Sequence, residues 1–374
     1  MRVWVIGRAI PTKKNNMAGS FELEQAQMLA RHGCEVYYLV LDIYSIRRRK
    51  LGLVKREIDG VNVITLSFPI GRLLPARSRN QFSAILRRIE FAITAKNYGM
   101  PDVVHVHYPA LYSYSAFRKM KEHGAKIICT EHWTKVQDKT LPAQNVKNLT
   151  DFADNCDAML CVGERLAKSV KELTNTTKPI EVIPNIVSEN FTYQEKVGAD
   201  GIFRFVGVGR LVACKRFDMM IRAFADAFNG DSSVRLDIIG GGEEYDSLKR
   251  IIHECGCDDQ ITLLGTMDRN EVAAYYHQCD ALVMSSNLET FGVPIIEAMA
   301  SGLPVITTDA MGFPSLFHEE HGYIIPMDQE EALMRSMRKL YENYSQFDKK
   351  AISQYAKKTY GEDMISSHLL QIYR

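Results

Sequence analysis

The chain has 374 residues, of which 46% are hydrophobic and 24% are charged, and its formal net charge is +1. This composition is typical of globular proteins and excludes disordered and fibrous classes, while the length favours two domains. No apolar run approaches the roughly 20 residues that cross a bilayer, and the run at 1–7 is too short for the core of a signal peptide. We therefore expect a cytoplasmic protein that begins with a strand.

Short apolar or β-branched runs alternate with segments of helical periodicity, which predicts an α/β fold of parallel sheets joined by crossover helices. Strands are expected near 2–7, 35–40, 61–66, 102–106, 125–130, 157–162 and 180–183 in the first half. In the second half they are expected near 202–208, 233–239, 260–264, 280–285, 303–307 and 323–325. From 329 to 374 the pattern predicts helices alone.

The alternation lapses after Pro184 and Asn185, and a polar stretch follows up to Gly201. This stretch is the expected linker, so we predict a first domain over 1–190 and a second over 191–357. The last helix, about 358–374, is expected to pack back on the first domain. Two doubly wound domains would face each other across a cleft at the carboxyl ends of their strands.

The charges are distributed unevenly between these two parts. Residues 1–190 carry 28 Lys and Arg against 18 Asp and Glu, a net +10, and the remainder carries 18 against 27, a net −9. The excess is concentrated at Arg47-Arg48-Arg49-Lys50, Lys55-Arg56, Arg72, Arg77, Arg79 and Arg87-Arg88. Such a surface can meet anionic lipid, a pyrophosphate-linked acceptor or nucleic acid, or it can simply be solvated.

The eight cysteines are scattered and form no CxxC pair, and several lie within apolar segments. We expect them to be small buried hydrophobic residues in a reducing compartment, without a zinc site. They are Cys34, Cys129, Cys156, Cys161, Cys214, Cys255, Cys257 and Cys279.

The segment at 287–306 reads NLETFGVPIIEAMASGLPVI and joins an expected strand to a helix beginning near Val293 or Pro294. Proline suits a first helical turn, and the free amides of Gly292 and Val293 would point at an anion there. Glu289 on the loop and Glu297 on the helix would both face the ligand and accept hydrogen bonds from sugar or ribose hydroxyls. The alternative is that Glu289 caps the helix and Glu297 is solvated.

This segment resembles the E-x7-E motif of the retaining glycosyltransferases of family four, also called group one. Three further segments match the family and stand in its order along the chain. They are VIPN at 182–185, GVGRLVACKR at 207–216 and IIGGGEEYDSL at 238–248. The resemblance implies that Arg210 and Lys215 bind the donor diphosphate, beside Gly209 and Gly241. Fixed cations suit that role, since the diphosphate gains negative charge as the glycosidic bond breaks.

Within the same resemblance, Glu289 positions the donor sugar and Glu297 binds the ribose. The residues between the two glutamates would line the donor; they are Thr290, Phe291, Gly292 and Val293. The loop at 308–315 follows the family's G-G-x-P-E pattern only in part, because Met311 and Ser315 replace its Gly and Glu.

The first half also resembles the family at the ends of its expected strands. In the sequence MAGS at 17–20, Gly19 stands where the family has a Gly-Gly pair near the donor phosphate, with Ala18 as a departure. The segment DVVHVHYP at 102–109 matches a strand end whose second histidine lies at the reacting sugar, so His107 is preferred to His105. The acceptor side is assigned to Glu131, His132 and Trp133; Trp133 would stack on a sugar or pack in the core.

The resemblance implies two Rossmann-like domains of the GT-B type that transfer a sugar, with retention, from a UDP- or GDP-linked donor to a glycan or lipid-linked acceptor. It implies no metal, no cofactor and no nucleic acid, since Arg210 and Lys215 take over the metal's electrostatic role. The expected location is the cytoplasm, with weak contact of the basic half with the anionic inner membrane surface. The alternatives are a nucleotide-sugar epimerase of the same architecture and a non-catalytic nucleotide-sugar binding protein.

Overall fold

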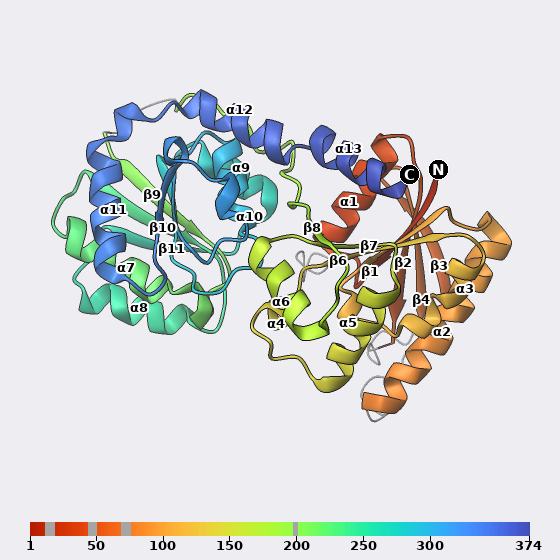
Figure 1. Cartoon of the computed structure of the whole chain (residues 1–374). Helices are drawn as coiled ribbons and strands as arrows, with labels where there is room; N and C mark the ends of the chain where they lie inside the picture. Colours follow the sequence, from red (N-terminus) through yellow and green to blue (C-terminus); the bar gives the residue numbers. More distant parts are fainter. Residues whose placement is uncertain (12–18, 44–50, 69–75, 197–200) are drawn as a thin grey trace. The chain divides into compact units, whose positions relative to one another are not determined.

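The computed structural model describes residues 1–11, 19–43, 51–68, 76–196 and 201–374 (Figure 1). The chain divides into two compact units. Unit 1 comprises Met1–Ile186 and Ile365–Arg374, and unit 2 comprises Val187–Met364. The chain crosses from one unit to the other at 186–187 and again at 364–365. The sequence pattern predicts these boundaries at 190 and near 357.

Unit 1 is built on an eight-stranded sheet with the strand order β3-β4-β2-β1-β5-β6-β7-β8. Its strands are β1 (Arg2–Gly7), β2 (Glu35–Asp42), β3 (Gly52–Ile58), β4 (Val61–Ser67), β5 (Val103–His107), β6 (Lys126–Glu131), β7 (Ala158–Cys161) and β8 (Ile180–Val182). Neighbouring strands pair in parallel except β3 and β4, which form an antiparallel hairpin. The predicted parallel α/β architecture is therefore confirmed, with β3 as an addition.

The sequence pattern missed β3 because its residues Lys55 and Arg56 are exposed and interrupt the apolar run. A signal was nonetheless present. Asp59 and Gly60 form the two-residue turn between β3 and β4, both with positive φ, at 45° and 79°. An Asp-Gly pair between two strands is among the strongest local hairpin signals.

The helices of unit 1 are α1 (Ser20–Arg31), α2 (Ala76–Tyr98), α3 (Arg118–Glu122), α4 (Thr134–Gln137), α5 (Ala143–Asn155), α6 (Glu164–Thr174) and the C-terminal α13 (Glu362–Tyr373). Helix α13 is bound to this unit by a shared core. Its buried Ile365, Leu369 and Tyr373 belong to the same cluster as Val3 and Val5 of β1. Burying three such side chains stabilises the helix on unit 1, since apolar burial contributes about 1.5–3 kcal/mol for each large side chain.

Unit 2 holds a six-stranded parallel sheet with the order β11-β10-β9-β12-β13-β14. The strands are β9 (Phe203–Val208), β10 (Val234–Ile239), β11 (Ile261–Gly265), β12 (Ala281–Met284), β13 (Val305–Thr308) and β14 (Gly322–Ile325). The helices are α7 (Phe217–Phe228), α8 (Tyr245–Glu254), α9 (Arg269–Tyr276), α10 (Val293–Ala300), α11 (Glu330–Glu342) and α12 (Lys349–Tyr360). The predicted run of helices after 329 is confirmed.

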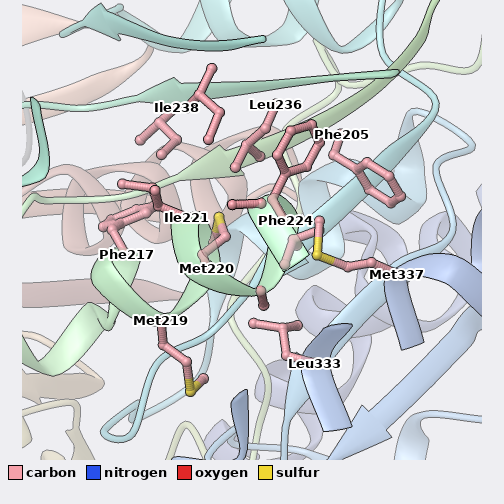
Figure 2. Close-up of a cluster of buried hydrophobic side chains, with 14 of the residues drawn as sticks. Phe205, Phe217, Met219, Met220, Ile221, Phe224, Leu236, Ile238, Leu333 and Met337 are labelled. Atoms are coloured by element: carbon pink, nitrogen blue, oxygen red, sulfur yellow. The ribbon is translucent and has the colours of Figure 1, made fainter. Parts of the chain in front are cut away.

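The core of unit 2 is centred on α7, whose buried face lies between the sheet and α11 (Figure 2). Met220 and Phe224 of α7 are buried with Phe205 of β9 on the sheet side. Leu333 and Met337 of α11 belong to the same cluster. This packing fixes the helix that follows β9, and with it the loop between them.

In each sheet there is a point at which the direction in which successive strands are added is reversed. In unit 2, β9 lies between β10 and β12, and in unit 1, β1 lies between β2 and β5. At such a point the loops after the two neighbouring central strands diverge, and ligands of open α/β sheets bind at the carboxyl ends there. The loops that follow β9, β12, β1 and β5 are therefore the places to look for a site.

Two glycine-rich loops of unit 2 touch backbone to backbone at this point. A Cβ atom on Gly240 would lie 1.8 Å from the carbonyl oxygen of Gly209, and one on Gly242 would lie 2.2 Å from that of Leu211. Neither distance can be tolerated without moving the backbone. The loops after β9 and β10 can approach this closely only because positions 240 and 242 are glycine.

We predict that Gly242→Ala destabilises unit 2 more than Gly230→Ala. At Gly242 the added methyl group meets the Leu211 carbonyl in an ordinary backbone conformation, and such overpacking costs about 1–3 kcal/mol or more. At Gly230 there is open space and only a φ of +84°, so the cost is about 1–2 kcal/mol. Thermal unfolding followed by circular dichroism measures both; a Gly230 variant that unfolds at the lower temperature would contradict the close approach.

Candidate functional site

The loops after β9 and β12 bring Lys215 and Glu289 together. Lys215 ends the short 3-10 turn η4 (Ala213–Lys215), and its Nζ forms an ion pair with Oε1 of Glu289. The same carboxylate oxygen accepts a hydrogen bond from Ser286 Oγ at 3.0 Å. Ser285 Oγ donates to the carbonyl of Lys215 at 2.9 Å, which ties the two loops together. The two side chains are 18% and 11% exposed, so solvent reaches this pair only in part.

Arg210 is exposed, but its backbone is fixed by the loops on either side. Gly209 N donates to the carbonyl of Ile239 at 3.0 Å, and Leu211 N donates to that of Gly241 at 3.0 Å. The structure therefore places Arg210 and Lys215 on one short segment after β9, with the backbone of the first residue fixed and the side chain of the second anchored.

Helix α10 begins at the predicted position. Gly292 is its N-cap residue with a φ of 97°, Pro294 lies in the first turn, and no side chain caps the helix. Gly312 N donates to the carbonyl of Phe291 at 2.9 Å, and a Cβ on Gly312 would lie 2.4 Å from the carbonyl of Thr290. The Phe291 side chain is buried against Phe313, with ring centroids 4.6 Å apart, so this residue shapes the loop from the core side. The first-turn amides, including that of Val293, follow directly on the loop of Glu289.

Glu297 is buried on α10 and is bound by a residue that the sequence did not indicate. Arg269, the first residue of α9, donates to its Oε1 from Nε at 2.9 Å and from Nη2 at 2.8 Å. Burial raises the pKa of Glu297, and the guanidinium of Arg269 acts against that rise. Both glutamates of the E-x7-E segment are thus paired with a cation, and no local pattern links position 269 to position 297.

In unit 1 the end of β5 carries two stacked histidines, with ring centroids 4.5 Å apart. His105 is satisfied on both sides, by Tyr373 OH at 2.5 Å from Nδ1 and by Thr130 Oγ1 at 2.7 Å from Nε2. His107 Nδ1 lies 2.9 Å from His132 Nε2, while its own Nε2 is buried without a partner among the described residues. Of the two, His107 is the one with unused hydrogen-bonding capacity.

Burial, followed by the neighbouring His132 and Arg8, holds the pKa of His107 well below its usual range. The imidazole is therefore neutral at physiological pH. The ring of His132 stacks on Tyr108 at 4.9 Å, and the guanidinium carbon of Arg8 lies 3.5 Å from the centre of the Tyr108 ring.

Arg8 directly follows β1, and its Nε donates to Oε1 of the buried Glu22 on α1 at 2.7 Å. Arg8, Glu22 and Tyr108 were not predicted from the sequence. Their positions in the sequence could have indicated two of them, because Arg8 and Tyr108 directly follow the neighbouring central strands β1 and β5, where the strand order reverses.

Glu131, His132 and Trp133 follow β6. Glu131 is buried, and its Oε1 accepts hydrogen bonds from the backbone amides of His132 and Trp133, both at 2.9 Å. Burial raises the pKa of Glu131 to about 7, although these amides favour its ionised form. The carboxylate therefore holds the turn that orients His132, and Trp133 is half-buried beside Lys135.

Gly19 precedes α1 with a φ of 81°, and a Cβ atom there would lie 2.0 Å from the carbonyl oxygen of Ala9. Tyr38 OH donates to the same carbonyl at 2.8 Å. Gly19 is thus required where the loop after β1 meets the start of α1. The neighbouring Met17 and Ala18 lie outside the described residues.

The predicted basic surface needs one correction. Arg87 is only 2% exposed and forms an ion pair with the fully buried Glu90, so it does not belong to the exposed basic surface. Arg88, Lys55 and Arg56 are exposed. The cluster 47–50, Arg72 and the side chains of Arg77 and Arg79 lie outside what the structure describes.

The cysteines of the chain are all free thiols; Cys214 and Cys255 are half-buried and the others are buried. Within the described ranges, no group of three or more His, Cys, Asp or Glu side chains could hold a metal ion. Among the described helices, none is both long and apolar enough to cross a bilayer.

Comparison with known proteins identifies two families, one for each half of the chain. Residues 191–359 match glycosyl transferases group 1, and residues 19–191 match glycosyltransferase family 4. One relative is the N-acetyl-alpha-D-glucosaminyl L-malate synthase of Bacillus anthracis, 25% identical over 284 residues, which are 68% of this chain and 73% of that protein. The alpha-monoglucosyldiacylglycerol synthase of Streptococcus pneumoniae is 29% identical over 121 residues, 32% of this chain and 27% of the relative.

Solved structures show the same fold over the whole chain. Sucrose-phosphate synthase of Thermosynechococcus elongatus superimposes with a TM-score of 0.78 at 18% identity, covering 100% of this chain and 98% of the other. HepE of Anabaena, solved in complex with UDP and glucose, gives a TM-score of 0.72 at 14% identity, covering 99% and 98%. The two family matches together span residues 19–359, and the chain therefore belongs to the group 1 glycosyltransferases of the family-four type.

Proposed function

We propose that this glycosyltransferase transfers a sugar, with retention of configuration and without a metal ion, from a nucleoside diphosphate sugar to an acceptor hydroxyl. The observation that carries the proposal is the anchored cation Lys215, paired with Glu289 and preceded by Arg210, where the strand order of unit 2 reverses. A structural neighbour bound to UDP and glucose supports a donor of this class. The relatives are named as synthases of sugar conjugates, which does not favour an epimerase.

The ion pair suits a role in stabilising a leaving group. An ammonium group has three donors, and among the described residues only Glu289 engages one of those of Lys215, so the others would meet phosphate oxygens. The carboxylate and Ser285 hold the lysine and its loop in place before the donor arrives. A charge that needs no reorganisation stabilises the departing diphosphate most effectively.

In the proposed reaction, the bond between the anomeric carbon and the diphosphate oxygen breaks while the acceptor oxygen bonds to the same face of that carbon. The acceptor proton passes to the departing phosphate oxygen, so no separate general base is required. Glu289 would position the donor sugar and Glu297, held by Arg269, would accept from the ribose hydroxyls. The neutral His107 of unit 1 would offer its unpartnered Nε2 to a sugar hydroxyl.

The relatives are named for different products, a glucosaminyl malate and a monoglucosyldiacylglycerol. We propose a glycan or lipid-linked acceptor in surface polysaccharide or glycoconjugate synthesis, bound on the side of unit 1 that includes Glu131, His132 and Trp133. A screen of UDP- and GDP-sugars by thermal shift identifies the donor, because a bound ligand raises the unfolding temperature. The anomeric configuration of the product, read by NMR, then tests retention; inversion would refute that part of the proposal.

We predict that Lys215→Ala lowers kcat/KM by about 10²-fold, because removing one preorganised group that stabilises developing charge costs roughly 3 kcal/mol. Arg210→Ala should behave similarly, and the double variant should lose less than the product of both effects, since both act on one diphosphate. Lys249→Ala, an exposed lysine on α8, is the matched control. Near-full activity of the Lys215 variant, with its fold intact by circular dichroism, would remove Lys215 from the site.

The two glutamates are predicted to differ in what they affect. Glu297→Ala should chiefly weaken the binding of the bare nucleoside diphosphate, whereas Glu289→Ala should chiefly lower kcat. The ribose is remote from the bond being broken, and the donor sugar is not. Calorimetric titration of UDP or GDP into both variants, together with steady-state rates, makes the comparison. An equal loss of nucleotide affinity in both would contradict this division of roles.

We further propose a weak contact between the basic part of unit 1 and an anionic membrane surface. Changing residues 47–50 to serine should reduce co-sedimentation with anionic vesicles at low salt, because each cation near such a surface contributes about 1 kcal/mol. A variant that loses four exposed cations of unit 2 has the same change in charge and should sediment like wild type; these cations are Lys249, Arg250, Lys357 and Lys358. If wild type does not bind the vesicles even at low salt, the proposed membrane contact is refuted and a soluble acceptor is favoured.

A further inference from the structure

Unit 1 contains a cavity of about 140 Å³ beside the place where its strand order reverses. Its walls come from the residues that follow β1 and β2, from α2 and from the segment after β5; they include Arg8, Ile43, Arg87, Leu111, Tyr112 and Phe117. A space of this size takes a small organic group, since a cavity of about 150 Å³ accommodates benzene.

The polar residues that line this cavity can all donate hydrogen bonds. They are the arginines Arg8 and Arg87 and the hydroxyl-bearing Ser83, Tyr112 and Ser113. Among the described residues, no Asp or Glu lines it. The two carboxylates that pair with the arginines, Glu22 and Glu90, are fully buried outside the lining. These carboxylates pair with the arginines from outside the cavity lining.

The guanidinium of Arg87 has more N–H donors than the described residues engage. Its Nη1 pairs with Oε2 of Glu90, and its guanidinium lies 5.4 Å from the centre of the Tyr112 ring. Its Nε is buried and has no partner among the described residues. A buried ion pair that served stability alone could be replaced by apolar side chains at little or no loss. An arginine that lines a cavity and is held by a single carboxylate can instead recognise a carboxylate or phosphate.

Arg8 connects this cavity with His107. Its guanidinium lines the cavity and also lies on the ring of Tyr108. Tyr108 stacks on His132, and His132 is hydrogen-bonded to His107. Arg8 is thus linked to the pair of histidines through Tyr108, within the same unit.

We propose that this cavity binds an anionic group, a carboxylate or a phosphate, of the acceptor substrate, and that Arg87 and Arg8 are the residues that recognise it. That the anion belongs to the acceptor rests on the function proposed above; the binding of the anion does not. The apolar part of the lining would contact the carbon atoms next to the charged group.

The test uses the full chain with two anionic probes and one neutral probe. Glycerol 3-phosphate and succinate are titrated by calorimetry, with glycerol as the neutral counterpart. The variant is Arg87→Met combined with Glu90→Gln, which removes the cation without leaving a buried carboxylate unpaired. The control is Arg88→Gln, the next residue on α2, which is exposed. Vesicles containing phosphatidic acid serve as a second phosphate source and distinguish a lipid headgroup from a free anion.

We expect at least one anionic probe to bind wild type and the Arg88 variant equally, and to bind the double variant roughly tenfold to a hundredfold more weakly, as expected for losing charge-assisted hydrogen bonds. Glycerol should not bind. Binding of phosphatidic acid vesicles that depends on Arg87, without a response to the soluble anions, assigns the group to a lipid. The proposal is overturned if neither source binds wild type, or if the double variant binds as wild type does.

A nucleotide control separates this proposal from the preceding one. Binding of UDP or GDP is measured in all three proteins and should be unchanged, because Arg210, Lys215 and Glu297, which are proposed to bind the nucleotide, lie in unit 2. Loss of the anion with the nucleotide retained supports the cavity. A wild type that binds the anion but no nucleotide would refute the proposed donor and leave the anion site standing.

Discussion

The reversal of strand order at the carboxyl edge of a parallel sheet is the constraint on which both candidate sites depend. At β9 and β12 the crossover helices leave in opposite directions, and the same happens at β1 and β5. The loops there cannot cover each other, so the space between them must be filled by side chains or by a ligand. In unit 2 that position holds Lys215 and Glu289, and in unit 1 it holds Arg8 and Tyr108.

The second recurring feature is a cation held by a carboxylate that is itself poorly exposed. Lys215 with Glu289, Arg269 with Glu297, Arg8 with Glu22 and Arg87 with Glu90 all follow this pattern. Burying an isolated carboxylate would be costly, so each carboxylate needs its cation. Conversely, each carboxylate restrains a long, flexible side chain whose remaining donors then point in a fixed direction. Such preorganised donors suit an anionic ligand better than mobile surface cations do.

Much of the fold could be predicted because parallel strands buried on both faces read as continuous apolar runs. The partners of the site residues could not. Arg269 meets Glu297, and Arg8 meets Glu22, only after helices have packed on the sheet, and no local spacing encodes such a meeting. Arg87 was misjudged for a related reason. Adjacent arginines on a helix point in different directions, and only the buried face that includes Glu90 shows which of the two is inside.

The histidines of β5 show how the end of the chain contributes to the site of unit 1. Residues two apart on a strand share a face, which is why His105 and His107 stack. Tyr373 of α13 and Thr130 hold both nitrogens of His105, so this ring is fixed and forms a rigid support for the next. His107 is then oriented by His105 on one side and by His132 on another, while burial keeps it neutral. A neutral, oriented imidazole can exchange hydrogen bonds with a hydroxyl without adding a second positive charge beside Arg8, and in the proposed site this leaves anion recognition to Arg8 and Arg87.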